Sequence, residues 1–526
     1  MVTISVSLES HMFSHTKSAI PIALAFTLAS MAAAGDWPQW GGTPAKNRVS
    51  HETGLPVDFL PGERLPDSEE IDLETTQNVK WVAKLGSQSY GNPTVSGGKV
   101  FVGTNNQSPR DSKYDGDRGV LYCFEEATGR FLWQLVVPKL AEGQVCDWEY
   151  VGICSSPAVD GDRVYVVTNR CEVVCLDVEG MSNGNDGPFQ DEAHHAAEPG
   201  EPPVEIGPTD ADILWVYDMR NELGIFPHNI TSSSILVVGD LLYATTSNGR
   251  DWTHVNIPFP DAPALICLDK TTGELRGREF SGISQRLFHC NWSSPAMGAI
   301  GDEGILLFGA GDGFCYGFDP VPRNDKDGLP ILAEFWRYDC NPLRYKVRDG
   351  EEIKYMSADG PSEIVATPVF YKGRVYVSAG QDPEHGTGVG ALNCIDAMRR
   401  GEISSSGKVW SYEGIRRSLS TVSILDDRVY AADIEGVVHC LDADTGNVYW
   451  THDTGGQIWG STLVADAKVY VGNENGVLTV LGTGQEKRIL GELEFDGPVY
   501  STPVAANGVL YVATETHLYA IGGPKR

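Results

Sequence analysis

Residues 155–167 read Ser-Ser-Pro-Ala-Val-Asp-Gly-Asp-Arg-Val-Tyr-Val-Val, and residues 172–177 continue with Glu-Val-Val-Cys-Leu-Asp. An apolar run leads into a turn at Asp160-Gly161-Asp162, and two further runs follow in which side chains alternate. Alternation with a period of two residues, bounded by Gly and Asp, predicts short strands joined by hairpins. This stretch is therefore one unit of an antiparallel sheet.

The same order of features returns along the chain. Close copies lie at residues 293–319, 366–396, 420–442 and 501–521, and weaker copies lie at residues 91–124, 233–269 and 461–481. A fourth element follows an Asp-x-x-Thr-Gly turn and carries a tryptophan, as at residues 442–450. A four-stranded sheet cannot bury both faces alone, whereas eight sheets closed into a ring can. The sequence thus predicts an all-β, eight-bladed β-propeller of four-stranded antiparallel blades.

The two ends of the repeat array predict how the ring closes. The last copy stops after its third strand, residues 517–521, and a spare strand at residues 78–85 precedes the first copy. We expect this N-terminal strand to complete the last blade. The propeller then occupies residues 78–526 with an insertion at residues 178–212, and residues 35–77 form an N-terminal extension.

The first 34 residues have the pattern of a secretory signal peptide. Residues 18–34 are apolar, follow Lys17 and end in three alanines. The stretch is shorter than the roughly 20 apolar residues that cross a bilayer. We expect cleavage near Ala34. Met12 is a second candidate for the start of translation. The mature protein should be exported, periplasmic or extracellular, and soluble.

The charge balance limits the classes of partner. The chain has 71 Asp and Glu against 40 Lys and Arg, a formal net charge of −31. Such a charge repels nucleic-acid phosphates and anionic lipid head groups. We expect no nucleic-acid partner, no membrane insertion and a monomer.

The turn Asp442-Ala-Asp-Thr-Gly446 with Trp450, preceded by Gly-x-Val-x-Cys-Leu-Asp, resembles the pyrroloquinoline quinone (PQQ) repeat of quinoprotein alcohol dehydrogenase-like propellers. The resemblance covers residues 81–521. The start Asp36-Trp-Pro-Gln-Trp40 and residues 364–386 are similar to exported PQQ-repeat proteins of planctomycete-type bacteria. The family implies that the fourth-strand tryptophans dock neighbouring blades; they are Trp81, Trp133, Trp215, Trp336, Trp410 and Trp450.

The resemblance implies one of two functions. Some members are dehydrogenases that hold PQQ beside calcium, and others are scaffolds without a cofactor. The alcohol dehydrogenases have two adjacent cysteines against the quinone, and some have a Cys-x-x-Cys-His haem motif; this chain has neither. We therefore expect a non-catalytic scaffold that binds a protein partner or a small polar ligand at the channel mouth. The alternative is a PQQ- and calcium-dependent dehydrogenase that oxidises an alcohol or sugar.

Candidate binding residues lie just upstream of each Ser-Ser-Pro-like start, because the innermost strands of a propeller converge on its axis. Arginines there would supply charge, aromatic rings would stack and amides would orient a ligand. The candidates for cofactor or ligand binding are Arg416, Arg417, Trp292, Trp459, Asn291, His289, His228 and Tyr500, with Asn92 and Cys154 in the first two copies. A calcium ion would take oxygen ligands from Glu363, Asn291 and Asn229.

Two alternatives explain some of the same residues. A solvated funnel whose polar groups pair with one another needs no ligand. A polysaccharide-binding module would use the aromatic rings of Trp292, Trp459 and Tyr500.

The insertion at residues 178–212 is rich in oxygen ligands, and it either binds a cation or forms an ordered surface loop.

Eleven cysteines fall into two groups. Six recur on the third strand of the repeat, where a thiol behaves as a small apolar side chain: Cys123, Cys175, Cys267, Cys315, Cys394 and Cys440. The others are Cys146, Cys154, Cys171, Cys290 and Cys340. One or two disulfides among these five are an alternative to core thiols in an exported protein, with the pairing left open.

Overall fold

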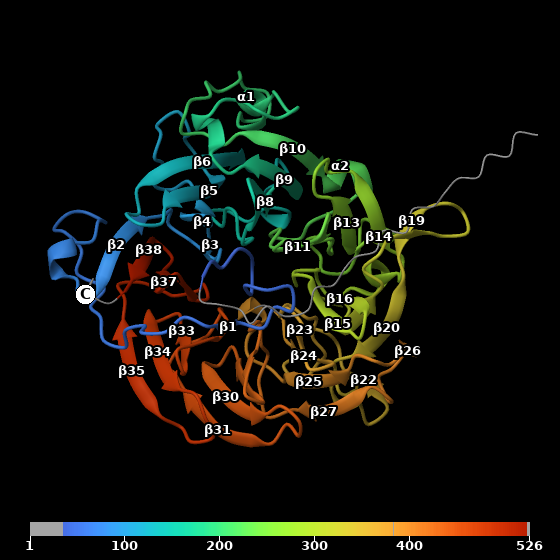
Figure 1. Ribbon diagram of the computed structural model, residues 1–526. Helices are drawn as coiled ribbons and strands as arrows, with labels where there is room; N and C mark the ends of the chain where they lie inside the picture. The colour runs from blue at the N-terminus through green and yellow to red at the C-terminus, as the bar shows by residue number, and fades with distance from the viewer. Residues whose placement is uncertain (1–34, 382, 523–526) are drawn as a thin grey trace, which may run out of the picture.

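Eight antiparallel sheets surround one axis in a computed structural model that describes residues 35–381 and 383–522 (Figure 1). The predicted signal peptide, residues 1–34, lies outside the described residues. Blade 1 holds β3 (Thr94–Ser96), β4 (Lys99–Asn105), β5 (Arg118–Glu125) and β6 (Phe131–Pro138). Blade 2 holds β7 (Ala158–Asp160), β8 (Arg163–Val167), β9 (Glu172–Asp177) and β10 (Ile213–Asp218). Blade 3 holds β11 (Leu236–Val238), β12 (Leu241–Thr245), β13 (Leu265–Asp269) and β14 (Leu275–Glu279). Blade 4 holds β15 (Ala296–Ile300), β16 (Glu303–Gly309), β17 (Phe314–Phe318) and β20 (Glu334–Asp339).

The second half repeats this arrangement. Blade 5 holds β23 (Val369–Tyr371), β24 (Arg374–Ala379), β25 (Ala391–Asp396) and β27 (Lys408–Tyr412). Blade 6 holds β28 (Ser423–Leu425), β29 (Arg428–Ala432), β30 (Val437–Asp442) and β31 (Val448–Asp453). Blade 7 holds β32 (Leu463–Ala465), β33 (Lys468–Gly472), β34 (Val477–Gly482) and β35 (Ile489–Glu494). Blade 8 holds β36 (Val504–Ala506), β37 (Val509–Ala513), β38 (His517–Ile521) and β2 (Val79–Lys84). The predicted eight-bladed propeller is confirmed.

The ring closes through the N-terminal strand, as predicted. Strand β2 pairs antiparallel with β38, with Val79 opposite Ile521 and Lys84 opposite His517. This pairing joins the two ends of the array in one sheet, so opening the ring would require a four-stranded blade to lose its outer strand.

Three blades are wider than the predicted four strands. In blade 3, β19 (Pro330–Leu332) pairs with β14 and carries β18 (Arg323–Asn324). In blade 4, β26 (Gly401–Glu402) pairs with β20, and in blade 7, β1 (Val49–Ser50) pairs with β32. Strands β18, β19 and β26 come from loops between the third and fourth strands of the following blade, and β1 comes from the segment before the array. All of them cover edges that would otherwise be open.

The remaining elements are short and lie before, between or within the blades. The helices are η1 (Leu73–Thr75), η2 (Gly143–Val145), η3 (Gly180–Ser182), α1 (Glu192–His195), α2 (Met219–Leu223), η4 (Ile283–Arg286), α3 (Leu343–Lys346) and η5 (Pro383–His385). Strands β21 (Val347–Arg348) and β22 (Glu351–Glu352) form a separate hairpin. Among the described residues, no helix is both long and apolar enough to cross a lipid bilayer.

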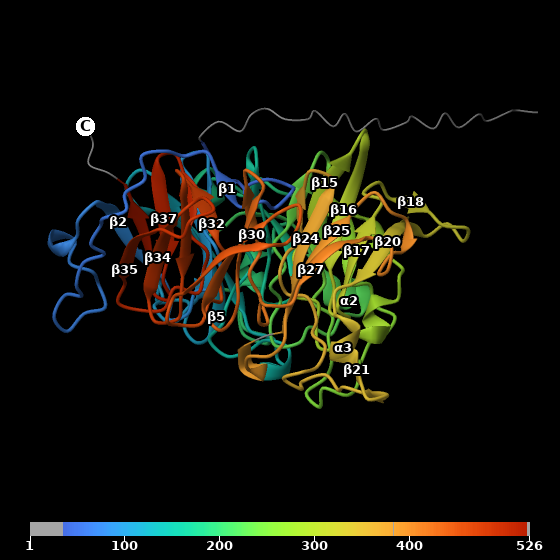
Figure 2. The ribbon, with the colours of Figure 1, turned by 90° about the horizontal axis from the view of Figure 1, so that it is seen from below.

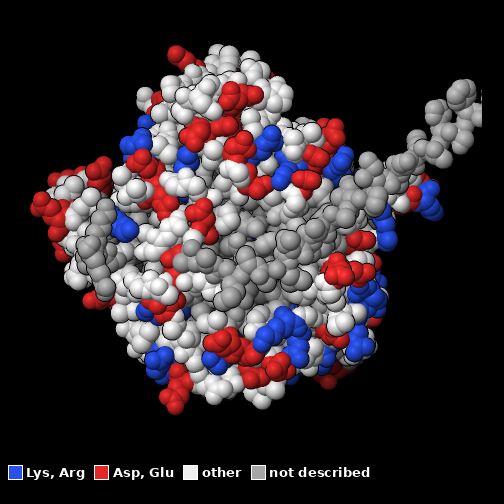
Figure 3. All heavy atoms as spheres, in the orientation of Figure 1, with Lys and Arg blue, Asp and Glu red and all other residues white. Residues whose placement is uncertain are grey.

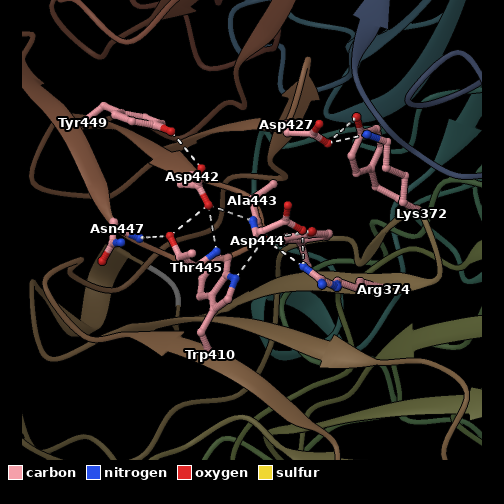
Figure 4. Close-up of polar contacts among 12 residues, drawn as sticks. Lys372, Arg374, Trp410, Asp427, Asp442, Ala443, Asp444, Thr445, Asn447 and Tyr449 are labelled. Carbon is pink, nitrogen blue, oxygen red and sulfur yellow. Dashed lines mark hydrogen bonds and ion pairs between the residues drawn. The ribbon is translucent and has the colours of Figure 1, made fainter.

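The repeated turn and tryptophan join each blade to the next (Figure 4). At the seam between blades 5 and 6, Trp410 Nε1 donates to the carbonyl of Ala443 at 2.9 Å. Asp442 Oδ1 shapes the turn by accepting the backbone N–H of Thr445 at 2.8 Å. Gly446 has a φ of +72°, and a Cβ there would lie 2.7 Å from the Trp410 ring. The turn therefore needs glycine for its conformation and for room.

The same hydrogen bond recurs at four other seams, always to the blade that follows. It joins Trp81 to Glu126, Trp133 to Val178, Trp336 to Ala397 and Trp450 to Gly484. Five of the six predicted tryptophans thus show the docking role that the family resemblance implied. The sixth, Trp215, makes no such hydrogen bond, but its ring packs against Gly273 of the next blade, where a Cβ would lie 2.6 Å away.

Residues 36–50, the N-terminal cap, cross one end of the channel (Figures 1 and 2). The cap bonds in turn to the first strand of seven blades. The pairs are Trp37 with Val95, Pro38 with Val159, Pro44 with Met297, Ala45 with Phe370, Asn47 with Ile424, Arg48 with Val464, and Ser50 with Ala505. Helices α2 and α3 lie toward the opposite face in Figure 2. The cap thus ties seven blades together and covers one channel end.

Two cationic side chains of the cap are fully buried. Lys46 Nζ donates to the carbonyl of Trp40 at 2.9 Å. The Arg48 guanidinium lies 4.2 Å from the Trp40 ring centroid and donates to the carbonyl of Thr462. Burial lowers the pKa of Lys46 to about 7, with the charge of Arg48 as a second cause, and burial lowers the pKa of Arg48 to about 9.

We expect the Lys46→Met substitution to change how stability depends on pH. The folded-state pKa of Lys46 lies below its ordinary value of 10.5, so burial of the charged ammonium lowers the free energy of unfolding. The full cost applies below pH 7, where Lys46 is charged in both states. This cost disappears as the pH rises from 7 toward 10.5. Wild type should therefore gain at least about 1 kcal/mol of unfolding free energy relative to Lys46→Met between pH 7 and pH 10. Urea unfolding at both pH values measures it, with exposed Lys326→Met as control. An equal difference at both pH values would contradict it.

Candidate functional site

A ring of hydrogen bonds surrounds the channel axis at the start of the first strands. The backbone N–H at this position in one blade donates to the side chain at the same position in the next blade. The donor and acceptor pairs are Asn92 to Ser156, Ser156 to Ser234, Ser234 to Ser294, Thr367 to Thr421, Thr421 to Ser461, Ser461 to Thr502, and Thr502 to Asn92. At Thr367 the hydroxyl accepts Trp40 Nε1 of the cap at 3.0 Å instead. The Ser-Ser-Pro motif therefore has a structural role at the channel.

A cavity of about 320 Å³ lies within this ring. Residues of the ring contribute hydroxyls and an amide to its wall, and six aromatic residues contribute rings: Trp40, Tyr90, Trp148, Trp292, Trp459 and Tyr500. Tyr90 stacks on Tyr500 with ring centroids 5.2 Å apart, and Trp459 lies 5.1 Å from Tyr500. Among the described residues that line the cavity, Glu384 is the one with a charged side chain. The cavity is thus aromatic, hydroxyl-rich and poor in positive charge.

The predicted site residues separate into three groups. The cavity is lined by Trp292, Trp459, Tyr500, Asn229, Asn92 and Cys154. His228, His289 and Glu363 lie beside it in a cluster behind Trp292, whose ring centroid is 4.8 Å from that of His289. His289 Nδ1 lies 3.9 Å from Glu363 Oε1. The remaining predicted residues, Arg416, Arg417 and Asn291, have other partners.

The two predicted arginines do not line the cavity. Arg416 is half-exposed, and its Nε lies 3.4 Å from Glu435 Oε2. Arg417 is fully buried and donates to the carbonyls of His385, Gly386 and Ser357. These contacts join the β24–β25 loop to residues 353–363, so Arg417 organises the channel mouth without facing the cavity.

The residues present do not fit a calcium–PQQ pair. Asn291 is committed to the backbone, because its Oδ1 accepts the N–H of Gly311 and its Nδ2 donates to the carbonyl of Asn248. Glu363 Oε1 accepts a hydrogen bond from the Tyr355 hydroxyl at 3.3 Å. Asn229 is among the described residues that line the cavity, whereas Glu363 is not. The quinone also carries carboxylates, and no Lys or Arg is among the described cavity-lining residues.

All eleven cysteines are buried and carry free thiols, so the structure contains none of the disulfides considered among Cys146, Cys154, Cys171, Cys290 and Cys340. The Cys171 and Cys290 thiols donate to the carbonyls of Thr246 and Ser247. Burial raises the pKa of Cys154 in the cavity wall to about 12. This thiol is neutral near pH 7 and is a poor nucleophile.

The insertion after β9 brings three carboxylates together. One oxygen each of Asp177, Asp186 and Asp212 lies within 4.8 Å of the other two. Burial raises the pKa of Asp177 and Asp212, and neighbouring acidic groups raise both further. Backbone N–H groups of the insertion donate to these side chains, as from Asp186 to Asp212 at 2.9 Å. The contacts fit an ordered loop, and a cation site here stays a prediction.

Several residues at the site were not predicted. Trp40 belongs to the cap, and Tyr90 lies two residues before Asn92. His254 lies in the β12–β13 loop, Tyr355 in the segment between blades 4 and 5, and His385 in the β24–β25 loop. The paired tryptophans of the start motif, Trp37 and Trp40, were the available signal for the cap. The loop residues had none, because they lie away from the repeat positions.

The sheet order, the closing strand and the docked tryptophans define a PQQ-repeat β-propeller. The chain belongs to the family described as outer membrane protein assembly factor BamB, which matches residues 74–279, 345–451 and 402–488.

One curated relative has an enzymatic name. Quinohemoprotein alcohol dehydrogenase ADH IIB of Pseudomonas putida is 26% identical over 141 residues, which make up 23% of this chain and 18% of that enzyme. The match therefore spans less than a fifth of that relative's length.

The chain is also similar to solved structures at low sequence identity. BamB from Moraxella catarrhalis has a TM-score of 0.49 and 14% identity, with 85% of this chain and 98% of that chain covered. Quinohemoprotein alcohol dehydrogenase from Comamonas testosteroni has a TM-score of 0.46 and 14% identity, with 94% and 82% covered.

Proposed function

We propose that this protein is an exported, non-catalytic propeller that binds a small, neutral, hydroxyl-bearing molecule, such as a sugar, in its central cavity. The observation that carries the proposal is the cavity wall, which combines six aromatic rings with hydroxyl and amide groups. Aromatic rings cover the apolar faces of a sugar, and the polar groups between them bond its hydroxyls. The export part rests on residues 18–34, outside the described residues.

Charge separates this ligand from the alternatives. The protein carries a net charge of −31, and the described cavity wall holds a carboxylate and no cationic side chain. An anionic ligand would lose hydration there without gaining a counter-charge. Acidic and basic side chains are also intermixed on the part of the face that Figure 3 colours. These features favour a neutral ligand over PQQ, a nucleotide or a phosphorylated sugar.

The cavity volume limits the size of the ligand. About 320 Å³ lies at the lower end of the roughly 300–1,000 Å³ range of small-molecule pockets. The cap covers one channel end and contributes Trp40 to the wall, so a long polymer could not pass through. A mono- or disaccharide fits these limits better than a polysaccharide chain.

Calorimetric titration tests the proposal. From a panel of neutral mono- and disaccharides, we expect at least one to bind. The anionic sugars gluconate and glucose 6-phosphate should give no heat of binding. Trp459→Ala should weaken binding at least about tenfold, the loss of one aromatic contact of about 1.4 kcal/mol. Phe280→Ala is the matched control, since this ring is 60% exposed on the outer surface.

Three outcomes would overturn the proposal. One is binding that is unaffected by Trp459→Ala, which would place the ligand elsewhere. Another is tight binding of PQQ with calcium, seen as a new absorption band and dye-linked oxidation of alcohols. The third is the absence of binding by every sugar of the panel at millimolar concentration.

A further inference from the structure

Three histidines converge at the channel mouth, on the side opposite the cap. They are His228 before blade 3, His254 in the β12–β13 loop and His289 before blade 4. The ring centroids of His228 and His289 are 4.3 Å apart, and His254 lies 4.9 Å from the first and 4.8 Å from the second. One nitrogen of each ring lies within 4.8 Å of the other two. His228 and His289 are buried, and His254 is half-buried.

A short backbone segment holds the three rings together. Residues 248–250 form bridges to both histidine segments, Asn248 to Pro227 and Gly249 to Cys290. A Cβ on Gly249 would lie 2.6 Å from the His228 Cβ, so glycine is required for this approach. The backbone N–H of Arg250 donates to the carbonyl of His289 at 3.0 Å. The positions of His228 and His289 are therefore fixed by one strand-like segment between them.

The side chain of Arg250 fixes the third histidine. Its Nη1 donates to the carbonyls of His254 at 3.0 Å and Val255 at 2.8 Å. Its Nε donates to the carbonyl of Leu287 at 2.8 Å, two residues before His289. One guanidinium thus ties the His254 loop to the His289 segment. Such an arrangement keeps the imidazoles in place before any ion arrives.

The hydrogen bonding of His228 determines which nitrogen it offers. His228 Nδ1 lies 2.6 Å from the carbonyl oxygen of Arg250. A carbonyl can only accept, so Nδ1 carries the proton and Nε2 has the lone pair. Histidines that bind metals commonly donate their other N–H to a backbone carbonyl in this way.

We propose that His228, His254 and His289 bind one divalent transition-metal ion of the zinc or copper class. Three nitrogens that lie at most 4.8 Å apart are within about 2.8 Å of a common centre, compared with the 2.0–2.1 Å of a zinc–imidazole bond. Each nitrogen therefore has to move by less than about 1 Å. Imidazole suits zinc and copper, whereas calcium prefers oxygen ligands, so this site differs in kind from the calcium site that the sequence suggested.

The surroundings supply a carboxylate and a boundary to the cavity. Glu363 is buried beside His289 and accepts the Tyr355 hydroxyl, and a carboxylate next to a ligating histidine stabilises the positive charge of a bound ion. His385 lies nearby, with its ring centroid 5.2 Å from that of His289. The three histidines are not among the described residues that line the cavity, whereas Trp292 lines it and its ring centroid lies 4.8 Å from that of His289, so the proposed metal site is distinct from the proposed sugar site.

Metal analysis of the mature protein without a histidine tag tests the proposal. After removal of metal by a chelator and incubation with Zn²⁺ or Cu²⁺, we expect one equivalent to remain bound through gel filtration. With Co²⁺ as probe, the visible absorption of a three-imidazole site should appear. His254→Ala should weaken Zn²⁺ binding at least about 100-fold, because loss of a ligand costs no less than loss of an outer partner.

His254→Ala is the preferred variant because His254 is half-buried in a loop, where a substitution disturbs the fold less than at the buried His228 or His289. Its thermal unfolding without metal should match wild type, which separates loss of metal from loss of fold. His194→Ala is the matched control, since this imidazole is 62% exposed in the insertion and lies outside the cluster. Binding of less than a tenth of an equivalent by wild type, or unchanged binding by His254→Ala, would overturn the proposal.

Discussion

The substitution Trp336→Ala should lower the free energy of unfolding by about 4 kcal/mol, as expected for a fully buried tryptophan. Trp336 is 0% exposed on β20 of blade 4, and its Nε1 donates to the carbonyl of Ala397 in blade 5 at 3.1 Å. The ring packs so closely on Gly317 that a Cβ there would lie 2.5 Å from it. Alanine would leave a cavity at the seam and an unpaired buried carbonyl.

Urea unfolding followed by tryptophan fluorescence and circular dichroism measures the effect. Trp252→Ala serves as the control because that ring is 56% exposed, and it should change stability by less than about 0.5 kcal/mol. Because the blades form a closed ring, we expect the two signals to shift together. A loss below about 1.5 kcal/mol for Trp336→Ala would show that the seam tolerates the cavity and that blade docking does not depend on this ring.

The propeller could be predicted from the repeat because every copy forms a sheet that cannot bury both of its faces by itself. The apolar alternation at residues 155–177 predicts strands that cannot bury both faces alone, and the incomplete last copy predicts the closing partner at residues 78–85. Pairing of Val79 with Ile521 confirms that inference. The extra strands β18, β19 and β26 escaped it, because they lie in loops between the third and fourth strands of a repeat, and β19 and β26 pair in parallel with the edge of the preceding blade.

The site was less predictable because proximity to the axis does not fix where a side chain points. Trp459 and Tyr500 face the cavity, yet Arg417, also upstream of a first strand, is enclosed by backbone carbonyls. Asn291 has both amide atoms bonded to the backbone. The conformation of the β12–β13 loop and the hydrogen bonds of Arg250 place His254 beside His228. Such contacts depend on loop conformation, which alternation and spacing do not encode.

Substituting Trp37 by alanine should release the N-terminal cap from the propeller. Trp37 is almost fully buried in the core cluster that joins blades 1 and 8, and its ring packs against Gly42, where a Cβ would lie 2.9 Å away. Loss of the ring removes about 3 kcal/mol or more of packing from a segment that is otherwise held by hydrogen bonds to the blades and by the buried side chains of Lys46 and Arg48. Local opening then needs less energy than global unfolding, so the cap should open first.

Hydrogen exchange detects this opening directly. The backbone N–H groups of Val159, Met297 and Val464 donate to cap carbonyls, and in Trp37→Ala they should exchange at least about 100-fold faster, the equivalent of about 2.7 kcal/mol. Amides in the outer strands should keep wild-type protection, since they do not contact the cap. Leu60→Ala, in the same extension but 55% exposed, is the control. If the three amides stayed protected, the hydrogen bonds alone would suffice to hold the cap; if all strands lost protection equally, the cap and the ring would unfold as one unit.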